Sequence, residues 1–314
     1  MPDNLTTTTQ VDPAVATFYD RVLLKAAYPK LVHLKFAQHA RLDKKKGNTY
    51  KWRRYANLSD ATVPLSEGLT PPGQQLSKTD LTAKISWYGD YVHITDVVDL
   101  TVEDPVLTIA ADKLGKQSGK TFDSLMRDIL AACASSTNAS GGSNGNSPTE
   151  ITTADIDAIV KTLLGNDAEM ITEIIKASPG QGTSPVRAAF YGIMHTDLID
   201  DLEACTGFMS TAQYPNQKDV DEAEWGAVKN TRWLVSSNAH KDTSATPDEY
   251  KLPIIGKDAY GDVELINMKN IVKTFGSAGT ADPLNQRATS GWKAAWAARI
   301  LNDNFMHVLN VTHS

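Results

Sequence analysis

With 314 residues, 41% of them hydrophobic and 22% charged, the chain can bury a substantial core, as one large domain or two ordinary ones. Its longest apolar runs are too short to span a bilayer, and its N-terminus lacks the basic and apolar regions of a signal peptide. Its two cysteines, Cys133 and Cys205, indicate neither a disulfide framework nor a thiolate metal site. We therefore expect synthesis in a reducing cytoplasm and no membrane partner.

The formal net charge of −6 is distributed unevenly along the chain. Residues 1–60 hold 11 Lys and Arg against 5 Asp and Glu, whereas the rest of the chain holds 20 against 32. A basic front and an acidic rear favour head-to-tail contact between copies of the chain. The alternative is that both regions are solvated and that the basic region of one copy does not contact the acidic region of another.

The first predicted element is an N-terminal arm, residues 1–40. Its beginning is rich in Thr and punctuated by Pro, a composition typical of a segment with little order in the isolated subunit. Apolar residues then recur in a mixed helical pattern over residues 15–37, which Pro29 breaks.

An extended hairpin is predicted over residues 41–90. Residues 48–56 follow a turn signal and alternate in the manner of a strand. One face of this strand carries Tyr50, Trp52 and Arg54, and the other carries Lys51, Arg53 and Tyr55. A stretch rich in Pro, Gly, Ser and Thr leads to a second alternating run, residues 81–95. Because two strands and a long loop enclose little core, this hairpin should need a partner surface.

A long helix is predicted over residues 104–132. An Asp-Pro pair marks its start, and apolar residues recur near the 3.6-residue period to its end. A helix of that length measures about 40 Å and is typical of a spine against which other elements pack. Two i,i+4 ion pairs are expected on its solvent side: Asp112 with Lys116, and Asp123 with Arg127.

The best domain boundary in the sequence is the low-complexity segment 135–150. Thr152 and Asp155 then form a capping box for a helix that stops at Gly165. Further elements are expected in chain order: a shorter amphipathic run at 168–176, a buried strand at 186–194 and a short helix at 196–204. This alternation of helix and strand predicts a compact α/β or α+β unit over residues 150–280.

The tail shows strand patterning at residues 292–298 and again at 305–311. We expect it to lie beside the long helix and the second arm of the hairpin. The chain would then leave one domain, build a second and return. Before the tail, residues 282–287 predict a tight turn capped by Asp282 or Asn285.

Motifs for catalysis or cofactor binding are not found in the sequence. No phosphate-binding glycine motif occurs, the glycines of residues 256–261 indicate a turn between strands, and the seven histidines lack metal-ligand spacing. Cys205, at the end of an acidic helix, is expected to be inert. We expect no enzymatic activity, no cofactor and no metal. An enzyme with a site in residues 150–280 is an alternative, because catalytic groups can converge from distant positions.

A second alternative is a nucleic-acid-binding module that uses the basic hairpin. Residues 41–54 hold seven Lys and Arg against one Asp, and Trp52 and tyrosines could stack on bases. The acidic chain as a whole opposes such binding, and no second basic patch completes a groove.

Short stretches along the chain form an ordered series. They are YDR at 19–21 with Leu23 and Leu24, KWRR at 51–54, PLSEG at 64–68, YGDY at 88–91, DPV at 104–106, GKDAY at 256–260, and ADPLNQR at 281–287 followed by GWK at 291–293. In this order they resemble the major capsid proteins of tailed bacteriophages, in the subgroup named for the capsid protein of a podovirus of enteric bacteria. Each stretch is weak alone, and the series is specific.

The resemblance implies the α+β capsid fold that tailed phages share with herpesviruses. That fold has an N-terminal arm, an extended hairpin called the E-loop, a peripheral domain with a spine helix, and an inserted axial domain. The expected boundaries are the arm at 1–40, the E-loop at 41–90, the peripheral domain at 91–149 with its spine helix at 104–132, the axial domain at 150–280, and the return to the peripheral domain at 281–314.

The resemblance also implies a non-enzymatic major capsid (head) protein that self-assembles into the icosahedral virion shell around a double-stranded DNA genome. Its partners would be its own copies in hexamers and pentamers, separate scaffolding and portal proteins, optional decoration proteins, and DNA enclosed without sequence-specific binding. Assembly would take place in the host bacterial cytoplasm. The residues expected at contacts between subunits are Tyr50, Lys51, Trp52, Arg53, Arg54, Glu67 and Arg287. In this hypothesis the rings of Tyr50 and Trp52 bury against a neighbour, while Arg53 and Arg54 bind its carboxylates.

Overall fold

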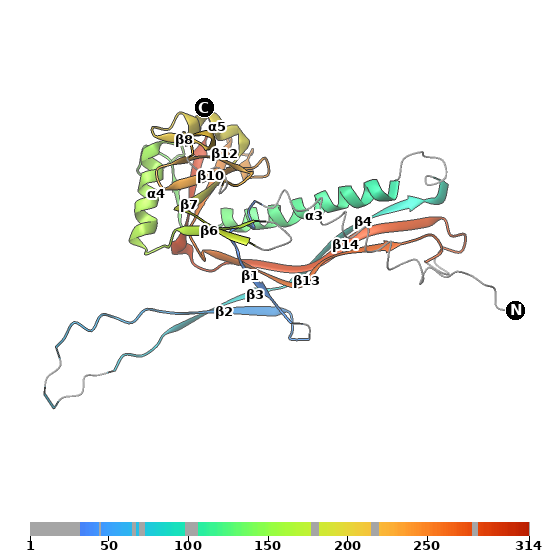
Figure 1. The fold of residues 1–314 in the computed structure, drawn as a ribbon, viewed down its shortest axis with the longest axis horizontal. Helices are drawn as coiled ribbons and strands as arrows, with labels where there is room; N and C mark the ends of the chain where they lie inside the picture. Colours follow the sequence, from blue (N-terminus) through green and yellow to red (C-terminus); the bar gives the residue numbers. More distant parts are fainter. Residues whose placement is uncertain are drawn as a thin grey trace.

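Figure 1 shows a computed structural model of the chain, in which a large sheet lies at one end, a helix-covered sheet extends from it, and a hairpin projects away. The structure describes residues 32–43, 45–64, 67–68, 73–97, 106–176, 182–214, 220–277 and 282–313. Most of the expected N-terminal arm, and the expected helix start at 104–105, lie outside the described residues. The mixture of helices and strands confirms the α+β class. Among the described residues, no helix is long and apolar enough to cross a membrane.

The described helices and strands alternate irregularly along the chain. The helices are α3 (Val106–Ala131), α4 (Thr153–Gly165) and α5 (Ile199–Glu203), with short 3-10 turns η2 (Thr196–Leu198), η3 (Thr211–Gln213) and η5 (Asp303–Phe305). The strands are β1 (Gln38–Arg41), β2 (Thr49–Tyr55), β3 (Lys78–Lys84), β4 (Ser86–Thr95), β5 (Ser136–Asn138), β6 (Ile171–Lys176), β7 (Gly182–Met194), β8 (Phe208–Ser210), β9 (Glu224–Val228), β10 (Thr231–Val235), β11 (Lys241–Asp242), β12 (Glu249–Ile255), β13 (Tyr260–Lys273), β14 (Arg287–Ile300) and β15 (Met306–Thr312).

The helix-covered sheet has four strands in the order β1-β13-β14-β4. Its two central strands have 14 residues each, and α3 runs along one of its faces (Figure 1). Phe122 of α3 packs against Trp292 and Trp296 of β14, with ring centroids 5.6 and 5.5 Å apart. Leu114, Met126 and Leu130 are also on the buried side of α3. The helix has 26 residues, about 39 Å in length, and lies within the range expected for it.

The two ion pairs expected on α3 have different outcomes. Lys116 pairs with Asp112 on the solvent side, at 2.7 Å. The expected Asp123–Arg127 pair is wrong, because Asp123 is buried and accepts the backbone N–H of His33 at 2.9 Å. An i,i+4 spacing identifies residues that can meet on a helix, but it does not show which side of the helix faces the core.

The larger sheet has nine strands, with β5-β15-β12-β7-β10-β9-β8 as its main path and β6 and β11 paired at its sides. Phe190, Trp233 and Ile254 are fully buried in its core, and α4 packs Ile156 and Leu163 against them. The amphipathic run expected at 168–176 is strand β6. The buried strand expected at 186–194 is part of β7.

Helix α4 begins at the expected capping box. The Thr152 side chain accepts the N–H of Asp155, and the Asp155 carboxylate accepts the N–H of Thr152. Asp155 also accepts the N–H groups of Ser140 at 3.0 Å and Gly142 at 2.6 Å. Strand β5 pairs with β15, so part of the low-complexity segment 135–150 is an edge strand of the nine-stranded sheet, and the domain boundary expected in this segment stays a prediction.

The tail divides between the two sheets. Strand β14 pairs with β13 and β4 beside α3, as expected. Strand β15, however, pairs with β12 and β5 in the nine-stranded sheet, so the expected return of residues 281–314 to the helix-covered sheet is correct only for β14. A strand pattern shows that one face is buried, but it does not identify the sheet that buries it.

Candidate interface between copies of the chain

The hairpin of β2 and β3 leaves the rest of the molecule as a two-stranded ribbon (Figure 1). The two strands pair along their full length, and residues 56–77 connect them. The hairpin is shorter than the range 41–90 expected for it, since its second arm ends at Lys84. The reason is that Ile85 is buried against the four-stranded sheet and the next strand, β4, joins β14.

Tyr50 and Trp52, which were expected to bury against a neighbour, pack on their own chain. Their rings meet edge to face with centroids 4.8 Å apart. Both are half-buried beside Ala83 and Ala295 at the root of the hairpin. These rings therefore anchor the ribbon to the four-stranded sheet, and a contact with a neighbour stays a prediction for their exposed edges.

Two cations of the hairpin, Lys51 and Arg53, form ion pairs within it, and all three cations of β2 are solvent-exposed. Arg53 Nε lies 3.0 Å from Asp80 Oδ1 and Lys51 Nζ lies 3.4 Å from Asp80 Oδ2, both across the ribbon. The hydrogen bond from Arg53 lowers the pKa of the Asp80 carboxyl, and Lys51 adds to this effect. Arg54 faces Thr79 and is exposed. The partner expected on a neighbour for Arg53 is thus supplied first by its own hairpin.

The tip of the hairpin, defined as residues 56–77, is acidic and partly apolar. It contains Asp60 and Glu67 and no Lys or Arg. Both carboxylates are exposed, as are Leu58 and Val63, and Val63 is 81% exposed. Apolar side chains exposed on a projecting loop are available to pack against a partner.

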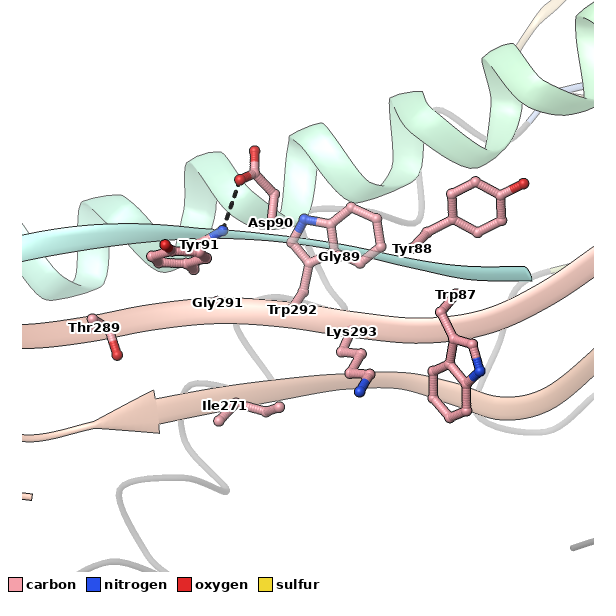
Figure 2. Close-up of a pocket in the computed structure, with 10 residues that line it drawn as sticks. All are labelled: Trp87, Tyr88, Gly89, Asp90, Tyr91, Ile271, Thr289, Gly291, Trp292 and Lys293. Atoms are coloured by element: carbon pink, nitrogen blue, oxygen red, sulfur yellow. Dashed lines mark hydrogen bonds between the residues drawn. The ribbon is translucent and has the colours of Figure 1, made fainter. Parts of the chain in front are cut away.

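The face of the four-stranded sheet opposite α3, which we call the open face, carries exposed rings. Trp87 and Tyr91 of β4 are 54% and 61% exposed, and Ile271 of β13 is 44% exposed. Figure 2 shows Trp87 pointing away from the helix, whereas Trp292 points toward it. These residues line a groove of about 430 Å³ between β4, β14 and β13.

Two glycines form the floor of this groove. A Cβ on Gly291 would lie 2.6 Å from the Cβ of Tyr91, and a Cβ on Gly89 would lie 2.6 Å from the carbonyl oxygen of Trp292. The close approach of β4 and β14 therefore requires glycine at both positions. Without side chains there, the surface between Trp87 and Tyr91 stays hollow.

Cations surround the groove. The exposed Lys and Arg on this face are Lys269, Lys273, Arg287 and Lys293. Lys269 lies opposite Lys293 in the sheet, and the ammonium group of Lys293 lies 4.5 Å from the centre of the Trp87 ring, a cation–π contact. At the alternating positions that share this face within 87–95, 269–273 and 287–295, the described residues include no Asp or Glu. The open face is therefore both basic and aromatic.

Arg287, expected at a subunit contact, lies at the edge of the open face. The turn expected at 282–287 is confirmed: Asp282 accepts the backbone N–H of Arg287 at 2.7 Å, and Asn285 has a φ of 54°. The Arg287 guanidinium lies 4.0 Å from the Asp282 carboxylate and its side chain is half exposed.

The sequence interpretation missed the open face as a whole, because β4 and the distant pair β13 and β14 build it together. The available signal was period-2 spacing: Trp87 with Tyr91, and Lys269 with Lys273, lie on one side of their strands. Only the pairing register shows that these sides coincide.

Other candidate sites do not assemble. No group of three or more His, Cys, Asp or Glu in the described part of the chain could hold a metal ion. His33 and His39 contact separate carboxylates, those of Asp123 and Asp262. Burial raises the pKa of the Cys205 thiol, which leaves little thiolate. A pocket beside α4 holds about 50 Å³, far less than a substrate site needs.

Comparisons with known proteins agree on one kind of protein. Residues 78–308 match the model of a family described as phage capsid protein. The fold is similar to the capsid of Ralstonia phage GP4 (11% identity, TM-score 0.67, 89% of this chain and 87% of that chain) and to the head of Helicobacter pylori bacteriophage KHP40 (11%, 0.64, 88% and 87%). It is also similar to the capsid of cyanophage P-SCSP1u (14%, 0.61, 89% and 88%). Among curated proteins, none matches the sequence significantly.

Proposed function

Because the chain belongs to the phage capsid protein family, as a major capsid protein that forms the virion shell, we propose that its copies join through the hairpin tip and the open face. The tip of one copy lies in the groove of the next. The observation that carries this proposal is charge complementarity: the tip contains Asp60 and Glu67 and no Lys or Arg, and Lys269, Lys273 and Lys293 lie on the open face, where the described alternating positions hold no Asp or Glu.

Apolar contact supplies most of the affinity in this arrangement. Burying a side chain such as Leu58 or Val63 contributes about 1.5–3 kcal/mol, and the rings of Trp87 and Tyr91 offer the matching surface. An exposed ion pair contributes only about 0.2–1 kcal/mol, so the charges chiefly select the partner and its register. Each contact is modest, and closure of a shell multiplies them through effective concentration.

The expected parts of the capsid fold have counterparts in this arrangement. The hairpin corresponds to the E-loop, the four-stranded sheet with α3 to the peripheral domain, and the nine-stranded unit to the axial domain. A tip-to-face contact is heterologous, so it generates rings, here hexamers and pentamers. Scaffolding, portal and any decoration proteins are separate chains, the shell encloses DNA without reading its sequence, and assembly takes place in the host bacterial cytoplasm.

Charge reversal tests the proposed contact. Lys269→Glu with Lys293→Glu should abolish particles seen by electron microscopy, because the open face would then repel the acidic tip. Adding Asp60→Lys and Glu67→Lys to the same chain should restore them. The matched control is Lys113→Glu with Lys120→Glu, two exposed lysines of α3, which should assemble normally.

Two outcomes would contradict the contact. One is normal assembly by the Lys269→Glu, Lys293→Glu chain. The other is binding of nucleic acid at the open face, rather than at residues 41–54 of the hairpin, since a basic and aromatic face can also stack bases. If unassembled subunits bind single-stranded DNA with a steep salt dependence that this variant loses, while assembly is unchanged, the open face is a nucleic-acid site.

A further inference from the structure

Strand β1 joins the rest of the molecule to the hairpin. It pairs in parallel with β13 over four residues, Gln38 to Arg41 opposite Gly261 to Glu264. The next residue, Leu42, donates its N–H to the carbonyl oxygen of Glu264 at 2.9 Å. The chain therefore enters the first arm of the hairpin directly from a strand that is paired with the sheet.

Two charged pairs lie across this short contact. His39 Nδ1 is 2.6 Å from Asp262 Oδ1, and the other oxygen of Asp262 accepts the indole N–H of Trp296 at 3.2 Å. Asp262 is only 3% exposed, whereas the His39 side chain is about half exposed. Arg41 lies opposite Glu264 in the register. Cations of β1 thus face carboxylates of β13 at alternate positions.

We propose that the pairing of β1 with β13, which we call the clamp, positions the hairpin, and that protonation of His39 stabilises this pairing. The inference rests on the proposed role of the hairpin, and it assigns His39 and Arg41 as positioning residues for that role. Their partners are Asp262 and Glu264, which share one face of β13 and repel each other when both are ionised. A cation on β1 removes that repulsion.

The direction of the pH dependence follows from these neighbours. The hydrogen bond with Asp262 raises the pKa of His39, and Glu264 adds to the effect. A histidine with a raised pKa stabilises the clamp fully below its unfolded pKa, and the contribution is lost as pH rises through the folded value. Burial raises the pKa of Glu264, Asp262 raises it further, and His39 and Arg41 oppose this. Its carboxylate is therefore the second negative charge that His39 and Arg41 offset.

Hydrogen exchange on the unassembled full-length chain tests the clamp. Between about pH 6 and about pH 8.5, the protection of the β1 amides, corrected for intrinsic exchange, should fall about tenfold. His39→Lys, which stays charged over this range, should keep its protection at both values. His39→Gln should be weakly protected at both. The control His93→Gln removes a histidine of the open face and should behave as the unmodified chain does.

Equal protection of β1 at both pH values in the unmodified chain would overturn the proposal. So would an unchanged pH dependence in His39→Gln or in His39→Lys. If His39→Gln does not fold, the unmodified chain and His39→Lys still decide. Because the measurement uses unassembled subunits, a result against the clamp would not contradict the tip-to-face contact. Evidence against that contact would likewise not contradict the clamp.

Discussion

Single residues decide how closely β4 and β14 approach and therefore how hollow the open face is. Gly291 lies opposite Tyr91 in the sheet, and a methyl group there would meet the Tyr91 Cβ and the Asp90 carbonyl oxygen, so it must push the two strands apart. Gly291→Ala should lower the free energy of unfolding by about 1–3 kcal/mol, the usual cost of overpacking. It should also weaken assembly, because it fills the groove.

Urea unfolding measures the first effect, and Gly165→Ala, at the end of α4, is its control outside the proposed contact, because a Cβ on Gly165 meets no atom within 4 Å. Equal stability of the two variants would show that β4 and β14 tolerate the extra methyl group. Particle yield should be compared for the same two variants. A lower yield in Gly291→Ala alone would show that filling the groove, and not the change from glycine to alanine, weakens assembly.

The charged residues show where inference from sequence stops at this scale. From the sequence, the hairpin cations and Arg287 were predicted to lie at contacts between subunits. The prediction that Tyr50 and Trp52 share one face of their strand is correct. Arg53 was assigned to a neighbouring copy, whereas Asp80 of the facing strand binds it. Alternation along one strand cannot show whether the opposite charge comes from the next strand or from another molecule.

Among the elements, the helices could be predicted because their signals are local. The 3.6-residue spacing of apolar residues predicted α3, and the capping box predicted the first turn of α4. The assignment of strands to sheets could not be predicted, because β14 and β15 have similar patterns and join different sheets. Strand β5 is three residues in a segment that composition marks as a loop.

The capping box of α4 supports a prediction at this scale. Thr152→Ala should cost about 1 kcal/mol, the usual value for a lost N-cap. Asp155→Ala should cost more, about 2–4 kcal/mol, because it also leaves the partly buried N–H groups of Ser140 and Gly142 without this acceptor. Asp157→Ala, a partly exposed position on the same helix, is the control for urea unfolding. A cost for Asp155→Ala no larger than for Thr152→Ala would show that the segment 135–150 does not depend on this carboxylate.

At the scale of the whole molecule, the two sheets share one chain that crosses between them repeatedly. Residues 32–37 and the face of α3 with Met126 and Leu130 form a common core with Tyr191 and Ile255 of the larger sheet. The hairpin, in contrast, contacts the rest of the molecule only near its root in the described part of the chain. A subunit with a shared packed core and a projecting acidic tip is suited to contact another copy of itself.

The central claim is that the hairpin tip of one copy occupies the open face of the next. Cryo-electron microscopy of assembled particles, at a resolution that resolves side chains, tests it most directly. We expect residues 56–77 to lie in the groove between Trp87 and Tyr91 of an adjacent copy, with Asp60 or Glu67 beside Lys269, Lys293 or Arg287. A hairpin folded onto its own sheet, or an open face with no neighbouring chain on it, would contradict the claim.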